Sequence, residues 1–273
     1  MAAVTGDGAT AARLTEGIAR WALPRRAQSV AAYAHHVELM TAVGQGDFEV
    51  AFHHANAISP AGEFAPYAWL APTVSLDLVE SAVRTGRHGD AAVAHVAAME
   101  EARLPAMSPR LAMLFHAASA LVAEGPKAPA HFTHALAVPG ADGYRFDVAR
   151  VRLLYGSHFR RHQAVAESRS HLRLALAAFE ALDAAPWTAR ARAELSATAQ
   201  TRATARARTP RALTPQEQQI AELAASGLTN KKIAEKMAIS HRTVGNHLYQ
   251  IYPKLGVASR GGLRDALRAQ PGG

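Results

Sequence analysis

The sequence has 273 residues, 49% of them hydrophobic and 19% charged, which is enough for one large domain or two smaller domains with buried cores. Its formal charge of +8 lies entirely in residues 201–273, which hold 12 lysines and arginines and 4 acidic residues. This uneven charge excludes a uniformly basic surface and indicates a phosphate-binding module beside a neutral body. The sequence has no cysteine, which excludes disulfides, cysteine-ligated zinc and a cysteine nucleophile.

No segment has the pattern of a signal peptide or a membrane span. The N-terminus lacks a basic stretch that leads into an apolar one. The longest apolar stretch, Leu111–Ala123, is interrupted by His116 and Ser119 and is too short to cross a bilayer. We therefore expect a cytoplasmic protein without a membrane partner.

Residues 1–200 contain an irregular repeat. At four places an apolar stretch with helical periodicity runs into a glycine, a short polar turn and a second such stretch. These glycines are Gly44, Gly86, Gly125 and Gly156. Glycine suits the residue that follows a helix, and Asp47 and Asp90 suit the N-caps of the next helices. The pattern predicts an array of helical hairpins that resembles tetratricopeptide-type repeats and serves as a sensor or interaction domain.

Apolar spacing indicates helices throughout this region. Leu76, Val79 and Val83 form one stripe, a long helix is predicted over Ala164–Leu182, and another follows Pro186, which suits the first helical position. Almost no strand-type alternation is present. Close helix pairing is expected at four alanines, Ala51, Ala55, Ala94 and Ala97. Packing in the core or between helices is expected of four aromatic residues, Trp21, Trp69, Tyr155 and Trp187.

The chain shows no pattern of a catalytic or metal site. Pairs such as His158 and His162 place two imidazoles on one helix face, but two ligands alone do not make a metal site. There is no nucleophile elbow of the form Gly-x-Ser-x-Gly and no strand to carry one. We expect no catalytic residue, no metal and no cofactor, and therefore no enzyme.

The composition changes after residue 200. Residues 201–212 hold four arginines, no acid and no large apolar residue, which predicts an Arg-rich linker. Four helix starts then follow within residues 213–273. Thr214, Thr229, Ser240 and Ser259 each suit an N-cap, and Glu217 completes a capping box with Thr214. Two short helices joined by a tight turn after a leading helix predict a helix-turn-helix, so the expected fold is all-α.

This C-terminal segment resembles the LuxR-type DNA-binding domain. The resemblance rests on four runs at fixed spacing, Leu213–Glu217, Gly227–Ala234, Ser240–Leu248 and Lys254–Arg260. The run Tyr249–Leu255, together with the helical region upstream, resembles the C-terminal part of large ATP-binding LuxR regulators similar to MalT. Those regulators carry a P-loop ATPase, and this chain has no Gly-x4-Gly-Lys-Ser/Thr motif. We therefore expect either a natural short form or a truncation without the ATPase domain.

The resemblance and the helix-turn-helix geometry place a recognition helix at about residues 240–254 in the major groove of DNA. Buried Val244, Leu248 and Ile251 would leave six positions facing outward: His241, Arg242, Gly245, Asn246, Tyr249 and Gln250. Asn246 can bind adenine through two hydrogen bonds, and Arg242 can reach guanine or a phosphate. Gly245 departs from the family, which often has a longer polar side chain there, and it weakens direct base contact.

Phosphate contacts are expected around this helix. The start of the second helix, Thr229, Asn230, Lys231 and Lys232, offers backbone N–H groups and two ammonium groups. Further candidates for DNA contact or for local capping are Ser240, Thr243, His247, Lys254 and Arg260. In the family the fourth helix often mediates dimerisation, but Gly261 and Gly262 should fray its first turn.

We expect a sequence-specific transcription regulator of bacterial origin. Its partners would be double-stranded promoter DNA, RNA polymerase and a second copy in a homodimer, with an effector or partner protein at the helical repeats. An alternative is a helical-repeat adaptor with a degenerate helix-turn-helix, which Gly245, Gly261 and Gly262 favour. A sigma-factor-like subunit would need an aromatic-rich acidic region before the module, and a receiver domain would need five strands; neither pattern is present.

Overall fold

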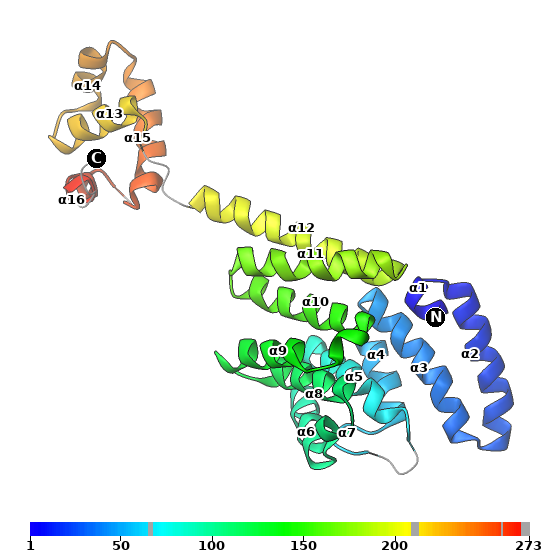
Figure 1. Ribbon diagram of the computed structural model, residues 1–273. Coiled ribbons are helices and arrows are strands. Elements are labelled where there is room, and N and C mark those ends of the chain that lie inside the picture. The colour runs from blue at the N-terminus through cyan, green and yellow to red at the C-terminus, as the bar shows by residue number, and fades with distance from the viewer. Residues whose placement is uncertain (65–67, 209–212, 258, 269–273) are drawn as a thin grey trace. The chain divides into compact units, whose positions relative to one another are not determined.

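The computed structural model describes residues 1–64, 68–208, 213–257 and 259–268, which fall into two units, Met1–Ala199 and Gln200–Gly273. Every regular element in these ranges is a helix and none is a strand, so the fold is all-α, as predicted (Figure 1). None of the described helices is both long and apolar enough for a membrane span. Residues 209–212 of the predicted linker and 269–273 of the predicted C-terminal domain lie outside the described residues.

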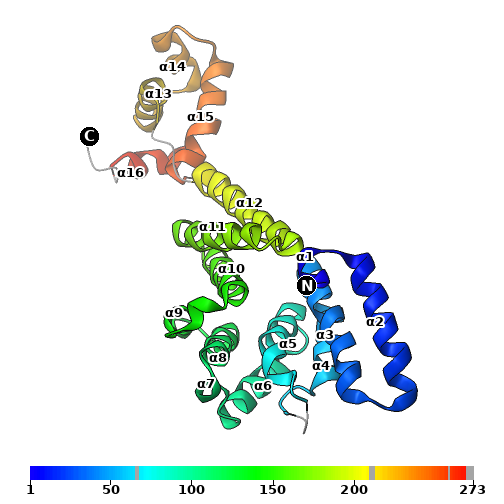
Figure 2. The same cartoon turned by 45° about the vertical axis from the view of Figure 1, so that its right-hand side comes forward.

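The first unit is a succession of helical hairpins. Its helices are α1 (Ala2–Thr5), α2 (Gly8–Ala22), α3 (Gln28–Gln45), α4 (Phe48–Ile58), α5 (Ala71–Thr85), α6 (Gly89–Glu101), α7 (Leu104–Met107), α8 (Pro109–Val122), α9 (Lys127–Ala137), α10 (Arg145–Arg161), α11 (Val165–Ala181) and α12 (Ala185–Arg208), with short 3₁₀ turns η1 (Leu23–Arg25) and η2 (Ala141–Gly143). The hairpins follow an arc that brings the start of α12 back beside α1 and α3 (Figure 2).

All four predicted hairpins are present, but two of the predicted helix-ending glycines lie inside helices. A Cβ at Gly156 in α10 would lie 2.6 Å from the Cγ atom of Leu172 in α11, and a Cβ at Gly44 in α3 would lie 3.1 Å from the Cβ atom of Pro186. The prediction was wrong there because these glycines permit close helix packing rather than a positive φ.

Of the other predicted helix boundaries, those at Gly86 and Asp47 are confirmed, whereas Gly125 lies three residues beyond Val122, the last residue of α8. Gly86 follows α5 with φ 69°, and α3 ends at Gly46 with φ 82°, two residues beyond the predicted glycine. The carboxylate of Asp47 accepts a hydrogen bond from the Val50 N–H at 3.2 Å and caps α4. Asp90, by contrast, lies in the first turn of α6, whose N-cap is the preceding His88.

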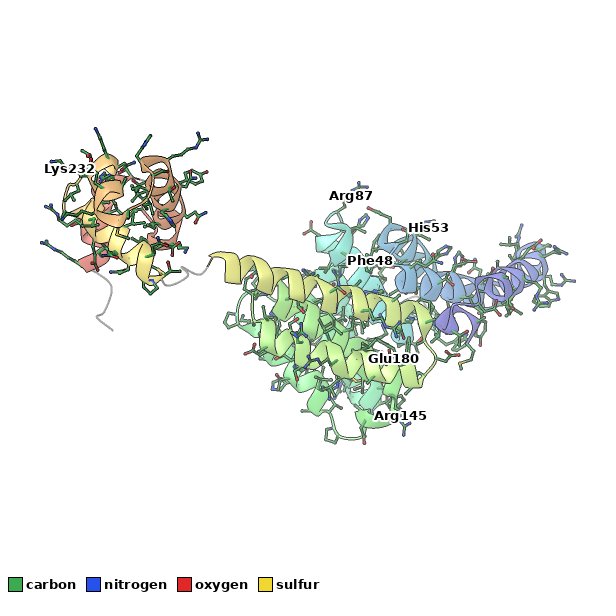
Figure 3. All side chains as sticks on the ribbon, turned by 90° about the horizontal axis from the view of Figure 1, so that it is seen from above. Phe48, His53, Arg87, Arg145, Glu180 and Lys232 are labelled. Atoms are coloured by element: carbon green, nitrogen blue, oxygen red, sulfur yellow. The ribbon has the colours of Figure 1, made fainter. Side chains whose placement is uncertain are left out.

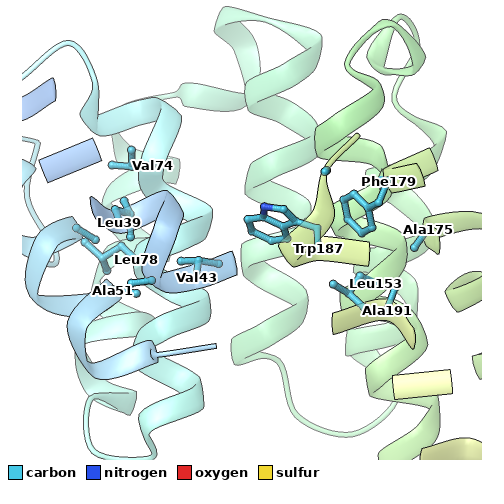
Figure 4. Packing of buried hydrophobic residues seen from close by; sticks show 14 of the residues in the cluster. Leu39, Val43, Ala51, Val74, Leu78, Leu153, Ala175, Phe179, Trp187 and Ala191 are labelled. Carbon is cyan, nitrogen blue, oxygen red and sulfur yellow. The ribbon is translucent and has the colours of Figure 1, made fainter. Parts of the chain in front are cut away.

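One core joins the beginning of the array to its end. Trp187 in α12 is fully buried and lies between Val43 on one side and Phe179 on the other (Figure 4). Trp187 and Tyr155 lie in the core, as predicted. Trp69 is 53% exposed but packs edge-on against Tyr33 of α3, with the two ring centres 4.9 Å apart, whereas the prediction is wrong for Trp21, which is 51% exposed.

Helix α5 occupies the interior of the unit. All its residues from Val74 to Ala82 are buried, including the charged Asp77 and Glu80. The paired helices bury small residues where they meet: Ala51 and Ala55 as predicted, but Ala92 instead of Ala94 and Ala97, which are exposed.

The second unit contains α13 (Pro215–Ala225), α14 (Asn230–Met237), α15 (His241–Leu255), η3 (Arg260–Gly262) and α16 (Leu263–Arg268). Its small core is built from apolar residues of all four α-helices: Ile220, Ala221, Ala224, Ile233, Ala234, Val244, Leu248, Ile251 and Leu263. Residues 201–208 of the predicted linker are helical, as part of α12, because alanine and arginine are strong helix formers.

Candidate nucleic-acid interface

Helix α13 begins with the predicted capping box. The Glu217 N–H donates to the Thr214 hydroxyl at 3.2 Å, and the Thr214 N–H donates to the Glu217 carboxylate at 2.8 Å. The same carboxylate receives the ammonium of Lys254 from the last turn of α15, at 2.5 and 2.6 Å. The hydrogen bond from Lys254, followed by that from the Thr214 backbone, lowers the pKa of Glu217 below its ordinary value.

Helices α14 and α15 form the helix-turn-helix. The Thr229 hydroxyl accepts from the Lys232 N–H at 3.4 Å at the start of α14, and the Ser240 hydroxyl accepts from the Thr243 N–H at 3.0 Å at the start of α15. Between them, Ala238 adopts the left-handed conformation, with φ 53° and ψ 40°, and turns the chain sharply. The turn between α14 and α15 is therefore bounded by Ala238, which ends α14, and by the Ser240 cap, which begins α15.

Helix α15 has one buried and one exposed face. Val244, Leu248 and Ile251 are buried, as predicted, which directs the opposite face to solvent. The exposed side chains are His241, Arg242, Asn246, Tyr249 and Gln250. Within the described part of the chain none of these five forms a hydrogen bond or an ion pair, so their polar atoms are available to a ligand. Tyr249 is 80% exposed.

The remaining predicted positions on α15 are less accessible. Gly245 and His247 are partly buried, and the Thr243 hydroxyl bonds to that of Ser240 at 2.8 Å. A Cβ added at Gly245 would have the Asn230 side-chain nitrogen, 4.0 Å away, as its nearest neighbour. The position therefore has room for a side chain, and the glycine there is not required by packing.

The predicted phosphate contacts fall into two groups. Lys231 and Lys232 are exposed in the first turn of α14, where the helix dipole favours an anion, and Lys232 extends from the surface (Figure 3). Asn230, Lys254 and Arg260 instead have partners inside the unit.

These partners come from distant parts of the chain. Arg260 donates to the Asn230 side-chain oxygen at 2.7 Å and to the Leu228 carbonyl, and it thereby ties η3 to the start of α14. Lys254 ties the end of α15 to Glu217. The sequence separations of 30 and 37 residues leave no local pattern for either contact. DNA contact by Asn230, Lys254 and Arg260 stays a prediction, and each has a structural role besides.

The fourth helix is short. Gly261 and Gly262 lie in the 3₁₀ turn η3, and the α-helical part runs only from Leu263 to Arg268. Across the described ranges, no group of three or more histidine or acidic side chains is arranged to hold a metal ion.

The luxR family of bacterial regulatory proteins matches residues 211–265. An HTH-type transcriptional regulator of Mycobacterium bovis is 48% identical over 61 residues, which are 22% of this chain and 7% of that protein. The HTH-type transcriptional regulator GfsR of Streptomyces halstedii is 45% identical over 62 residues, 23% of this chain and 26% of GfsR. The chain thus matches only a small part of the length of these relatives, and no solved structure matches it.

The family match covers the capped helices α13, α14 and α15 and reaches into α16. The C-terminal unit of this chain is therefore a helix-turn-helix domain of the luxR family.

Proposed function

We propose that this protein is a transcription regulator that binds promoter DNA with the N-terminal part of α15 in the major groove. The observation that carries the proposal is the exposed polar face of α15, whose side chains have no partner among the described residues. A buried face held by Val244 and Leu248 presents that exposed face rigidly, which base reading requires. The relatives named as transcriptional regulators support the same function.

The side chains contact different parts of the DNA in this proposal, according to their chemistry. The Asn246 amide offers a donor and an acceptor, which match the N7 and N6 atoms of adenine, and the Arg242 guanidinium matches guanine or a phosphate. Lys231 and Lys232, at the N-terminus of α14, bind phosphate without regard to sequence. The first unit binds an effector or a partner protein, and RNA polymerase is the machinery that such a regulator serves at a promoter.

The test is binding of the full chain to genomic DNA fragments over a range of salt concentrations. Lys231→Ala should weaken binding to all sequences and reduce the slope of log K against log salt by about 0.9, because one phosphate contact is lost. The matched control is Arg268→Ala, which removes an exposed cation on α16 and should leave the slope unchanged.

Asn246→Ala should reduce discrimination at one base pair by about 1–3 kcal/mol while binding to unrelated DNA stays the same. Gln219→Ala, an exposed amide on α13, is its control. Binding that does not depend on salt, or no binding to any fragment, contradicts the proposal. A partner protein retained under those conditions would instead support the adaptor with a degenerate helix-turn-helix.

A further inference from the structure

The first unit contains a cavity of about 230 Å³ between α4, α5, α10 and α12. Its apolar wall is formed by Phe48, Leu153, Ala193 and Ala197, and its polar wall by Arg84, Ser157, Arg160, Arg190 and Glu194. All of these residues belong to the helical unit, so the cavity shares no residue with the DNA-binding domain. The volume is below that of sites for drug-sized ligands, which limits the occupant to a small molecule.

Three arginines from three different helices line this cavity. Arg84 comes from α5, Arg160 from α10 and Arg190 from α12. The guanidinium carbons of Arg84 and Arg190 lie 5.4 and 5.3 Å from the centre of the Phe48 ring, so both side chains extend over the same part of the wall. A guanidinium offers N–H donors and no acceptor. The polar wall therefore favours a ligand that carries acceptors.

Two of the three arginines already have carboxylate partners. Arg190 donates to the Glu80 carboxylate at 2.7 Å, and the Nε atom of Arg160 donates to the Glu194 carboxylate at 2.6 Å. Arg84 is half-buried, and among the described residues it forms no hydrogen bond and no ion pair. The one acid in the lining is thus engaged by Arg160, and the charge of Arg84 is left without a direct partner.

The buried charges behind the cavity do not supply that partner. Arg150 lies 2.7 Å from Asp77 and 3.1 Å from Glu80. Burial opposes the ionisation of Glu80, but Arg190, Arg150 and then Arg84 outweigh it and lower its pKa to about 2. Three arginines face three carboxylates in this set of ion pairs, and the charge of Arg84 is the surplus.

The Ser157 hydroxyl is a second group without a partner at the same cavity. Ser157 is 0% exposed, and its Oγ atom has no hydrogen-bond partner among the described residues. A buried hydroxyl without a partner costs free energy, which an acceptor on a ligand would restore. Ser157 lies three residues before Arg160 on α10, so the two share one helix face. A neutral donor and a surplus cation therefore line one small cavity, and an anionic oxygen satisfies both.

We propose that this cavity binds a small anion whose charged end, a phosphate or a carboxylate, accepts hydrogen bonds from Arg84 and Ser157 and whose short apolar part packs against Phe48 and Leu153. The inference names the ligand class of the effector region and so rests on the proposed function. Binding is measured without DNA, so its failure leaves the DNA-binding test untouched.

The experiment is calorimetric titration of the full chain with three probes that share a propyl group: propyl phosphate, butyrate and 1-butanol. At least one of the two anions should bind at least about tenfold more tightly than the alcohol, because a hydrogen bond between charged groups is stronger than one to a neutral hydroxyl. The comparison of the two anions identifies the charged group that the site prefers. Equal affinity for all three probes, or no binding of either anion, would overturn the proposal.

Arg84→Gln should weaken binding of the preferred anion by at least about tenfold. Arg87→Gln is the matched control, because it removes the same charge from an exposed side chain that does not line the cavity, and it should change the affinity by less than about twofold. Equal losses in the two variants would mean that the anion is attracted by the basic chain as a whole, which contradicts the proposed site.

Ser157→Ala separates ligand binding from structure. Because the hydroxyl has no partner within the unit, its removal should not lower the free energy of unfolding, but it should weaken binding of the preferred anion by about tenfold. A folded Ser157→Ala protein that binds the anion as tightly as the wild type would show that the anion lies elsewhere and would overturn the proposal.

Discussion

The two units are stabilised in different ways. The helical array ties its ends together through buried charges: Glu80 in α5 meets Arg190, 110 residues further on, and Arg150, 70 residues further on. The DNA-binding unit has local caps formed by residues three positions apart, such as Thr214 with Glu217 and Ser240 with Thr243, and its longer-range polar contacts, Lys254 with Glu217 and Arg260 with Asn230, are only partly buried. Loss of one contact should therefore cost the array much more than it costs the small domain.

The largest effect is expected from Arg150→Met. The substitution keeps the unbranched apolar stem of the side chain but leaves Glu80 and Asp77 buried without that cation, which typically costs about 3–5 kcal/mol of stability. It also removes the guanidinium that lies 4.9 Å from the ring centre of Trp187. Chemical unfolding followed by tryptophan fluorescence reports this unit alone, because all three tryptophans lie within residues 1–199.

The control for this variant is Arg145→Met, an exposed arginine on the same helix, which should change the unfolding free energy by less than about 0.5 kcal/mol. Hydrogen exchange of α13–α15 should be the same in both variants. Equal losses for the two substitutions would mean that the buried charges do not hold the array together.

A second prediction concerns pH. Burial lowers the pKa of His95 to about 4, and its Nδ1 atom accepts a hydrogen bond from the Gly62 N–H at 3.2 Å. The unfolded chain, with a pKa of about 6.5, binds one more proton between these values, so stability falls as the pH falls below about 6.5. From pH 7 to pH 5 the loss through His95 alone should be about 2 kcal/mol.

The measurement is the unfolding free energy of wild type and His95→Gln at several pH values. The variant should show a shallower decline below pH 6.5, whatever its stability at pH 7. Parallel curves for the two proteins would show that His95 is protonated as easily in the folded unit as in the unfolded chain.

The same contrast explains what could be predicted from sequence. The caps of α13, α14 and α15 depend on neighbouring residues, so Thr214, Thr229 and Ser240 identified these helix starts directly. The burial of Asp77 and the contact of Lys254 with Glu217 depend on how distant helices pack. Periodicity within one helix carries no information about such contacts.

A third prediction, with a smaller expected change in stability, concerns two glycines of the helical array. Gly156→Ala should destabilise the array by about 1–3 kcal/mol, because the new Cβ would lie 2.6 Å from the Cγ atom of Leu172 and 3.1 Å from the Ser168 carbonyl oxygen. Gly17→Ala, in open space inside α2, should stabilise it by about 0.5–1 kcal/mol through helix propensity alone. If the two variants changed the unfolding free energy, measured by tryptophan fluorescence, in the same direction, the close approach of α10 and α11 would be contradicted.

The smallest expected effect tests whether local helix propensity limits the stability of the DNA-binding unit. Gly245→Ala should raise its stability by about 0.5–1 kcal/mol, because α15 gains helix propensity and nothing lies closer than 4.0 Å to the added Cβ. Gly262→Ala should bring no such gain, since its Cβ would lie 3.0 Å from the Val257 side chain. Hydrogen exchange of the α15 amides measures both changes. Slower hydrogen exchange in Gly245→Ala, together with unchanged DNA affinity, would show that this glycine is neither required for packing nor in close contact with DNA. Faster exchange would mean that the start of α15 depends on contacts beyond its own sequence.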